Sequence, residues 1–258
     1  MRKSTAKSDG IQNFEKRAQL IQTWRTKLSC FEKLAESWVY IRVRSKDYRP
    51  ISIHPDNPCG RLIPIQRVKK TDKIEGFPDL SEAIRKIKDA EPPNFYKPGN
   101  AKPELRIQAS LIRYALMNGL RLHGLFNDFS DVFDELIFVT DELRAGSIRP
   151  DIIALGGRQG RYFPVFIELK VDRKLKRVTE QLTNAKETMN NADGCFLNLL
   201  ANATGKPKSD ISIDNPKLFI IWSPSPSGKE DEDVTEVKAN GFIVGEYDPS
   251  TQQTVRSR

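Results

Sequence analysis

The chain has 258 residues, of which 38% are hydrophobic and 29% charged, the balance of an ordinary soluble protein long enough for a substantial core. Its apolar runs fall far short of the roughly 20 residues that a membrane helix needs, and its basic N-terminus lacks the apolar stretch of a secretory signal. Lys and Arg exceed Asp and Glu by 42 − 34 = 8, which favours a polyanionic partner because neutralised phosphates release counterions. We therefore expect a cytoplasmic protein without a membrane contact.

The first hundred residues predict a small α+β region. Apolar residues at steps of three and four in residues 13–37 predict an amphipathic helix, and the alternation in residues 38–44 predicts a half-buried strand. Proline is frequent in residues 91–103, which favours a linker. We place a boundary there, between an N-terminal region, residues 1–100, and a second domain, residues 101–258.

The second domain shows a regular order of helical and extended patterns. Pro103 suits the first turn of a helix, since its missing N–H does no harm there. The expected elements are a helix at residues 103–118, strands at 136–140, 151–155 and 163–170, a helix at 174–190 and a strand at 218–222. The predicted order is therefore helix, three strands, helix, strand.

Four other segments complete the expected outline. The run GGRQG, residues 156–160, predicts a turn because its glycines adopt positive φ freely. The acidic stretch KEDEDVTE, residues 229–236, predicts an exposed loop, and residues 241–247 predict a last strand. The basic tail VRSR, residues 255–258, is expected to fray.

Three residues with complementary chemistry gather at the ends of two predicted strands. Alternation along FPVFIELK sends Val165, Ile167 and Leu169 to one face, and Phe166, Glu168 and Lys170 to the other. Asp151 opens the preceding strand, which a short glycine turn joins to this one. Two carboxylates and one amine are therefore expected to converge at one edge of the sheet.

Such a group suits metal-dependent cleavage of a phosphodiester. Mg²⁺ prefers hard oxygen ligands, so two carboxylates together with a substrate phosphate fit it, and Mn²⁺ can substitute. Lys170 could orient or deprotonate the attacking water, or offset charge in the transition state. The alternative for Glu168 and Lys170 is a solvated strand face that carries a cross-strand ion pair, and for Asp151 a turn residue after Pro150 that caps a strand.

The run RPD that ends at Asp151, sixteen further residues and then Glu168 within IELK resemble the motif of the PD-(D/E)XK, or restriction-endonuclease-like, superfamily. The resemblance spans roughly residues 103–223. It implies an α/β fold with a mixed central sheet flanked by helices, extended here by the N-terminal α+β region. It also implies that Glu104 is an additional metal ligand and that Gln181 is a catalytic residue beside Lys170.

Two further sets of residues could assist that site. Gln108 lies one turn beyond Glu104 on the same helix face and is expected to support it. Basic residues just after the third strand could grip a phosphate backbone, or could simply form a solvated helix start; these are Arg173, Lys174, Lys176 and Arg177.

The function predicted from the sequence is a magnesium-dependent endonuclease that hydrolyses DNA, of a restriction or other defence type. Repair and recombination nucleases share the same core, and fold does not decide among these roles. A catalytically silent protein that binds nucleic acid or acts as a scaffold is the alternative from another class, and a ribonuclease is a third. Cutting both strands of a duplex usually needs two active sites, which is compatible with a homodimer.

Overall fold

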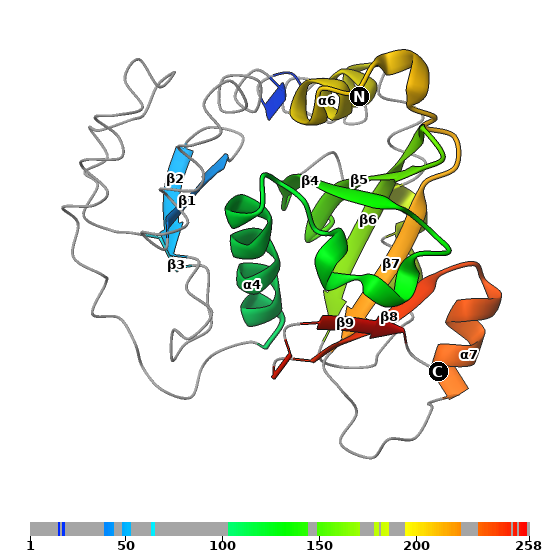
Figure 1. The fold of residues 1–258 in the computed structure, drawn as a ribbon. Helices are drawn as coiled ribbons and strands as arrows, with labels where there is room; N and C mark the ends of the chain where they lie inside the picture. Colours follow the sequence, from blue (N-terminus) through cyan, green and yellow to red (C-terminus); the bar gives the residue numbers. More distant parts are fainter. Residues whose placement is uncertain are drawn as a thin grey trace, which may run out of the picture.

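The structure is a computed structural model of a mixed α/β chain, drawn in Figure 1. It describes residues 15, 17–18, 39–43, 48–52, 63–64, 103–143, 149–170, 178–180, 182–185, 194–222, 232–248, 250–251 and 253–256. Two sheets are present in this part, one of three strands and one of six. No helix within these ranges is long and apolar enough to cross a membrane.

The smaller sheet belongs to the first hundred residues. It consists of β1 (Val39–Val43), β2 (Tyr48–Ser52) and β3 (Ile63–Pro64), and both pairings are antiparallel. β1 confirms the strand expected at residues 38–44. The predicted linker before Pro103 lies outside the described residues.

The larger sheet is mixed, and its strands lie in chain order from β4 to β9. β4, β5 and β6 form an antiparallel meander, β7 and β8 add in parallel, and β9 closes the far side antiparallel to β8. The strands are β4 (Glu135–Asp141), β5 (Ile152–Arg158), β6 (Arg161–Lys170), β7 (Lys217–Trp222), β8 (Ile243–Asp248) and β9 (Gln253–Arg256). A parallel pair needs a crossover, and helical residues 178–180 and 182–185 together with α6 (Cys195–Thr204) lie between β6 and β7.

The two faces of this sheet carry separate apolar clusters. Val165, Ile167 and Leu169 face the cluster that α4 (Pro103–Met117) and the 3-10 turns η1 (His123–Leu125) and η2 (Asn127–Phe129) cover. Phe166 faces the other cluster, which α6, α7 (Glu232–Ala239) and the helical residues after β6 cover. The alternation predicted along β6 is therefore confirmed, as are α4 and the three strands after it. Residues 178–180 and 182–185 of the helix predicted at residues 174–190 are helical, but α6, which follows them before β7, was not predicted.

The N-terminal segment also contributes to this core. Residues 15, 17 and 18 are helical, in agreement with the predicted helix whose other residues lie outside the described part. Ala18 packs into the second cluster, and the buried Arg17 donates from Nη1 to Thr140 Oγ1 at 2.7 Å. Because Arg17 also lies 3.9 Å from the buried carboxylate of Asp141, its positive charge is compensated inside the protein.

The turn predicted at GGRQG is shorter than the sequence indicates. Gly156, Gly157 and Arg158 belong to β5, and only Gln159 and Gly160 form the turn, both at positive φ (51° and 77°). Positive φ at both central positions defines the hairpin turn that matches the twist of antiparallel strands. A Cβ on Gly157 would lie 2.5 Å from Tyr162 Cε1, so this glycine is required by close packing rather than by a turn.

Three other expectations near the C-terminus are wrong. Residues 232–236 of the predicted acidic loop lie in α7, because Val234 and Val237 form a buried stripe at helical spacing. β8 is not the last strand, since β9 pairs beside it. The predicted fraying fails at Arg256, which ends β9 and forms an ion pair with Asp131.

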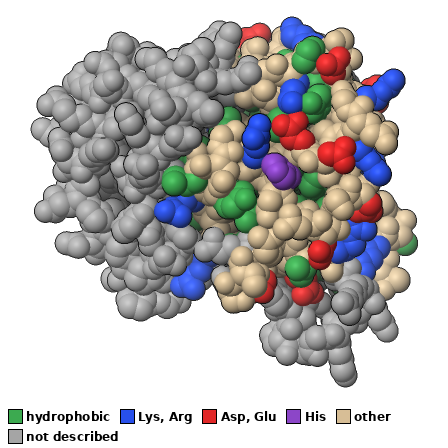
Figure 2. All heavy atoms as spheres, viewed as in Figure 1, with side chains coloured by type: hydrophobic (Ala, Val, Ile, Leu, Met, Phe, Trp, Pro, Cys, Tyr) green, Lys and Arg blue, Asp and Glu red, His purple; other side chains and the backbone are tan. Residues whose placement is uncertain are grey.

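Charged side chains of both signs share the surface. On the face drawn in Figure 2, acidic and basic side chains of the described residues are interspersed, and no continuous basic patch is seen among them. The surplus of positive charge is therefore not concentrated on the described part of this face.

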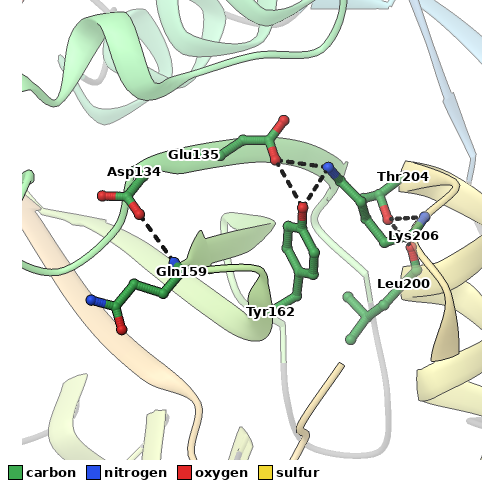
Figure 3. A network of polar contacts seen from close by, with 7 residues as sticks. All are labelled: Asp134, Glu135, Gln159, Tyr162, Leu200, Thr204 and Lys206. Atoms are coloured by element: carbon green, nitrogen blue, oxygen red, sulfur yellow. Dashed lines mark hydrogen bonds and ion pairs between the residues drawn. The ribbon is translucent and has the colours of Figure 1, made fainter. Parts of the chain in front are cut away.

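A polar network holds the end of the sheet where β4 begins and the β5–β6 hairpin turns (Figure 3). Lys206 Nζ lies 2.8 Å from Glu135 Oε2 and 2.7 Å from Tyr162 Oη, and 4.5 Å from the centre of the Tyr162 ring. The Asp134 carboxylate accepts a hydrogen bond from the Gln159 backbone N–H at 3.1 Å. These contacts fix the Tyr162 ring above Gly157.

We predict that Gly157→Ala lowers the stability of the fold by about 1–3 kcal/mol, because the added methyl group collides with a ring that the network holds in place. Urea denaturation followed by circular dichroism measures the change. Gly160→Asn is the control: a Cβ there has open space, and Asn adopts the positive φ of this turn at a lower cost than most residues. Its midpoint should therefore fall by less than that of Gly157→Ala. Equal midpoints for all three proteins would contradict the packing argument.

Lys206→Met should lower stability by less, about 0.5–1 kcal/mol, because the Lys206–Glu135 pair is about one quarter exposed and solvent screens it. Tyr162→Phe introduced into Lys206→Met tests the network. The loss of stability that it causes there should be smaller than in the wild type, because the phenol has already lost its lysine partner. Purely additive losses in the double variant would show that the two side chains act independently.

Candidate active site

Asp151 and Glu168 lie opposite each other, Asp151 just before β5 and Glu168 in the neighbouring strand β6. Asp151 directly precedes β5, one step beyond the pair formed by Ile152 and Ile167 in the β5–β6 register. The backbone N–H of Leu169 donates to Asp151 Oδ2 at 2.8 Å. This hydrogen bond places the Asp151 carboxylate beside the end of β6, as the sequence predicts.

The backbone carbonyl of Asp151 is also held, and from two other elements. It accepts hydrogen bonds from the backbone N–H of Glu142, just after β4, at 3.1 Å, and from Gln108 Nε2 on α4 at 3.0 Å. Since a carbonyl has two lone pairs, both positions are filled. The residue is therefore fixed by β4, α4 and β6 together.

Glu168 and Lys170 project from the same face of β6, as expected from the alternation. Lys170 Nζ lies 2.7 Å from Glu168 Oε1, and the two side chains are 22% and 6% exposed respectively. A lysine is rarely enclosed to this degree without a partner, and here the partner is the neighbouring carboxylate. The observed ion pair lies within one strand and is largely enclosed, so it differs from the solvated cross-strand pair considered as the alternative.

Burial and mutual repulsion disfavour the charged forms of the two carboxylates. Asp151 as a residue is half-buried, whereas its carboxyl group is enclosed; this burial, followed by the negative charge of Glu168, raises the pKa of Asp151 to about 8. Burial likewise raises the pKa of Glu168, although Lys170 opposes that rise. Burial, the largest single cause, acts to lower the pKa of Lys170. The charge and hydrogen bond of Glu168, together with the charges of Asp151 and Glu104, outweigh it, so the pKa of Lys170 lies above the ordinary value.

Glu104 lies in the first turn of α4, near this group. Its negative charge contributes to the raised pKa of both Glu168 and Lys170, which places it within electrostatic range of the pair. Among the residues that the structure describes, however, no group of three His, Cys, Asp or Glu side chains is arranged to hold a metal ion. Glu104 as a third ligand stays a prediction.

The remaining predicted site residues lie outside the described part of the chain. These are Gln181, for which only the neighbouring residues 178–180 and 182–185 are seen to be helical, and the basic residues Arg173, Lys174, Lys176 and Arg177. Their roles beside the site stay predictions.

Two residues at the site were not predicted in the roles that they have. Gln108 was expected to support Glu104, but its amide donates to the Asp151 backbone instead. Glu142 has φ 39° and forms an ion pair with Arg149, and its charge adds to the rise in the pKa of Asp151. Arg149 precedes Asp151 in the RPD motif, but only the folded chain brings Glu142 beside it.

The donor set at this site fits a magnesium ion. Two enclosed carboxylates supply hard oxygen atoms, and Mg²⁺ is commonly held by one or two carboxylates while waters and substrate phosphate complete its shell. Burial and then the charge of Glu168 raise the pKa of Asp151, and a divalent cation held between the two carboxylates would favour their charged forms. Asp151 and Glu168 are therefore the residues that would hold the ion.

Comparisons with known proteins identify no relative of this chain. No family model matches the sequence, and neither the curated proteins nor the solved structures contain a significant match. The argument for function therefore depends on the site itself.

We predict that Asp151→Asn raises the stability of the metal-free protein by about 1–3 kcal/mol at pH 7, measured by thermal melting in chelator. The amide still accepts the Leu169 hydrogen bond but carries no charge. Because the folded-state pKa of Asp151 lies above its ordinary value of 3.8, ionisation of wild-type Asp151 disfavours folding increasingly as the pH rises from 3.8 to about 8. The advantage of the variant should grow over that range, and a constant or reversed difference would contradict the raised pKa.

Proposed function

We propose that this protein is a magnesium-dependent endonuclease of the PD-(D/E)XK type that hydrolyses phosphodiester bonds in DNA. The observation that carries the proposal is the convergence of Asp151, Glu168 and Lys170 at one end of the central sheet, with Asp151 held by the Leu169 N–H. Two enclosed carboxylates and a lysine at the ends of adjacent strands are the groups that this chemistry requires.

The element order gives independent support. A helix, an antiparallel meander of three strands, helical residues and a parallel strand follow one another from α4 to β7. A restriction-endonuclease-like core has this order, and we propose that the region from α4 to β7 is such a core, with β8 and β9 added at its far edge.

The residues of the site divide the chemistry among them. When bound, the magnesium ion would polarise the phosphodiester and offset its negative charge. Asp151 and Glu168 hold the ion, and the hydrogen bonds around Asp151 keep its carboxylate from turning away. Lys170, which its raised pKa keeps protonated, orients the attacking water or neutralises charge on the phosphate as the bond breaks.

DNA as the substrate is supported by the net charge of +8. The described part of the face in Figure 2 offers no continuous basic surface, so we propose that contacts to the phosphate backbone are made elsewhere. The basic residues that follow β6, from Arg173 to Arg177, are the proposed contacts because Lys170 ends that strand. Cleavage of both strands of a duplex would then be achieved by two copies of the chain.

The test is cleavage of circular and linear DNA by the purified chain with Mg²⁺ or Mn²⁺. We expect cleavage by the wild type, and a loss of at least about 100-fold in Asp151→Asn and in Lys170→Met, because each removes a group that acts on the reacting phosphate. Chelator should abolish the activity of the wild type.

Lys206→Met is the matched control, because Lys206 is also an amine paired with a glutamate at the end of a strand, but at the opposite end of the sheet. It should keep the activity of the wild type. Cleavage that persists in both site variants would contradict the proposal. Cleavage of a matched RNA but not DNA would indicate a ribonuclease, and metal binding without cleavage of either would favour the silent scaffold.

A further inference from the structure

Gln108 is buried on the face of α4 that meets the site, with 1% of its surface exposed. Its Nε2 donates to the Asp151 carbonyl at 3.0 Å, whereas its Oε1 is buried and has no hydrogen-bond partner within the described part of the chain. The direction of the amide is well determined, since exchanging its oxygen and nitrogen would set two oxygen atoms against each other. The amide nitrogen is thus hydrogen-bonded, whereas the oxygen has no donor among the residues that the structure describes.

Stability alone does not account for a glutamine at this position. The Asp151 carbonyl keeps a hydrogen bond from the Glu142 N–H, so it would stay paired if the Gln108 amide were removed. A buried acceptor without a donor costs stability, and an apolar side chain of the same size would avoid that cost. The neighbouring apolar residues of the helix, Leu111 and Ile112, are fully buried, so such a side chain would be compatible with the surroundings.

The hydrogen bond from Gln108 does, however, restrain the one backbone unit that aims the Asp151 carboxylate. The carbonyl belongs to the same residue as the carboxylate, and the carboxylate is restrained by the Leu169 N–H on its other side. Rotation of this peptide would move the carboxylate relative to Glu168. A donor from α4 therefore ties the helix to the geometry of the proposed metal pair.

We propose that Gln108 is a positioning residue of the Asp151–Glu168 metal centre, acting through its hydrogen bond to the Asp151 backbone carbonyl. This inference rests on the proposed function only in that the site binds a divalent cation. Partners of this kind, which orient a ligand without touching the metal, commonly contribute 10- to 100-fold to metal affinity.

The experiment is a titration of the full chain, first freed of metal by chelator, with Mn²⁺ alone, followed by electron paramagnetic resonance of the unbound ion. Gln108→Met removes the donor at nearly constant size and is expected to weaken Mn²⁺ binding by about 10-fold. Its melting temperature without metal should equal or exceed that of the wild type.

Ser110→Ala is the matched control on the same helix, because the Ser110 hydroxyl lies near Tyr247 of β8, whose pKa it acts to lower, and no described hydrogen bond joins Ser110 to Asp151. It should lower the melting temperature and leave Mn²⁺ affinity unchanged. Unchanged Mn²⁺ affinity in Gln108→Met overturns the proposal. An equal loss of Mn²⁺ affinity in Ser110→Ala overturns it as well.

The outcome for the wild type separates this inference from the proposed function. Mn²⁺ binding by a wild type that cleaves no nucleic acid would contradict the endonuclease and leave the role of Gln108 to be decided by the affinities. A wild type that binds no Mn²⁺ overturns both.

Discussion

The hydrogen bond from the Leu169 N–H to the Asp151 carboxylate is the contact on which the arrangement of the site depends. It closes the gap between the residue before β5 and the end of β6, beyond the last paired residues of the two strands. The Asp151 carbonyl adds bonds from Glu142 and Gln108, so the end of β4 and the helix α4 meet at the same residue. An acid that is held on all sides in this way loses little entropy when a cation or a substrate arrives.

The sequence was informative where a pattern is local. Alternation along β6 placed Glu168 and Lys170 on one face, and helical periodicity placed α4 within a residue of its observed end. Trp222, which ends the strand predicted at residues 218–222, is fully buried in β7. Two features set by distant parts of the chain could not be predicted from the sequence. Glu142 lies beside Asp151, and Gln108 is bonded to the Asp151 backbone rather than to Glu104.

The errors of prediction have the same origin. Gly156 and Gly157 suggest a turn by their residue type, but the rings of Phe163 and Tyr162 across the hairpin occupy the space that side chains would need. The acidic composition of α7 suggested a loop. Its valines favour a helix only because they pack against an apolar cluster that the local sequence does not reveal. β9 has few apolar residues and depends on β8 and on Asp131 for its place. Tertiary contacts override local preference in each case.

The edges of the six-stranded sheet have a consequence for how two copies of this chain can meet. Along β4, the backbone of Leu120 and Leu122 already pairs with Phe138 and Leu136, and along β9 the Arg256 N–H is bonded to the Asp128 carboxylate. Free edge strands invite pairing with other chains, and occupied ones oppose both aggregation and dimers built by extending a sheet. These contacts therefore oppose a two-fold assembly in which the six-stranded sheet continues from one copy into the other at β4 or β9.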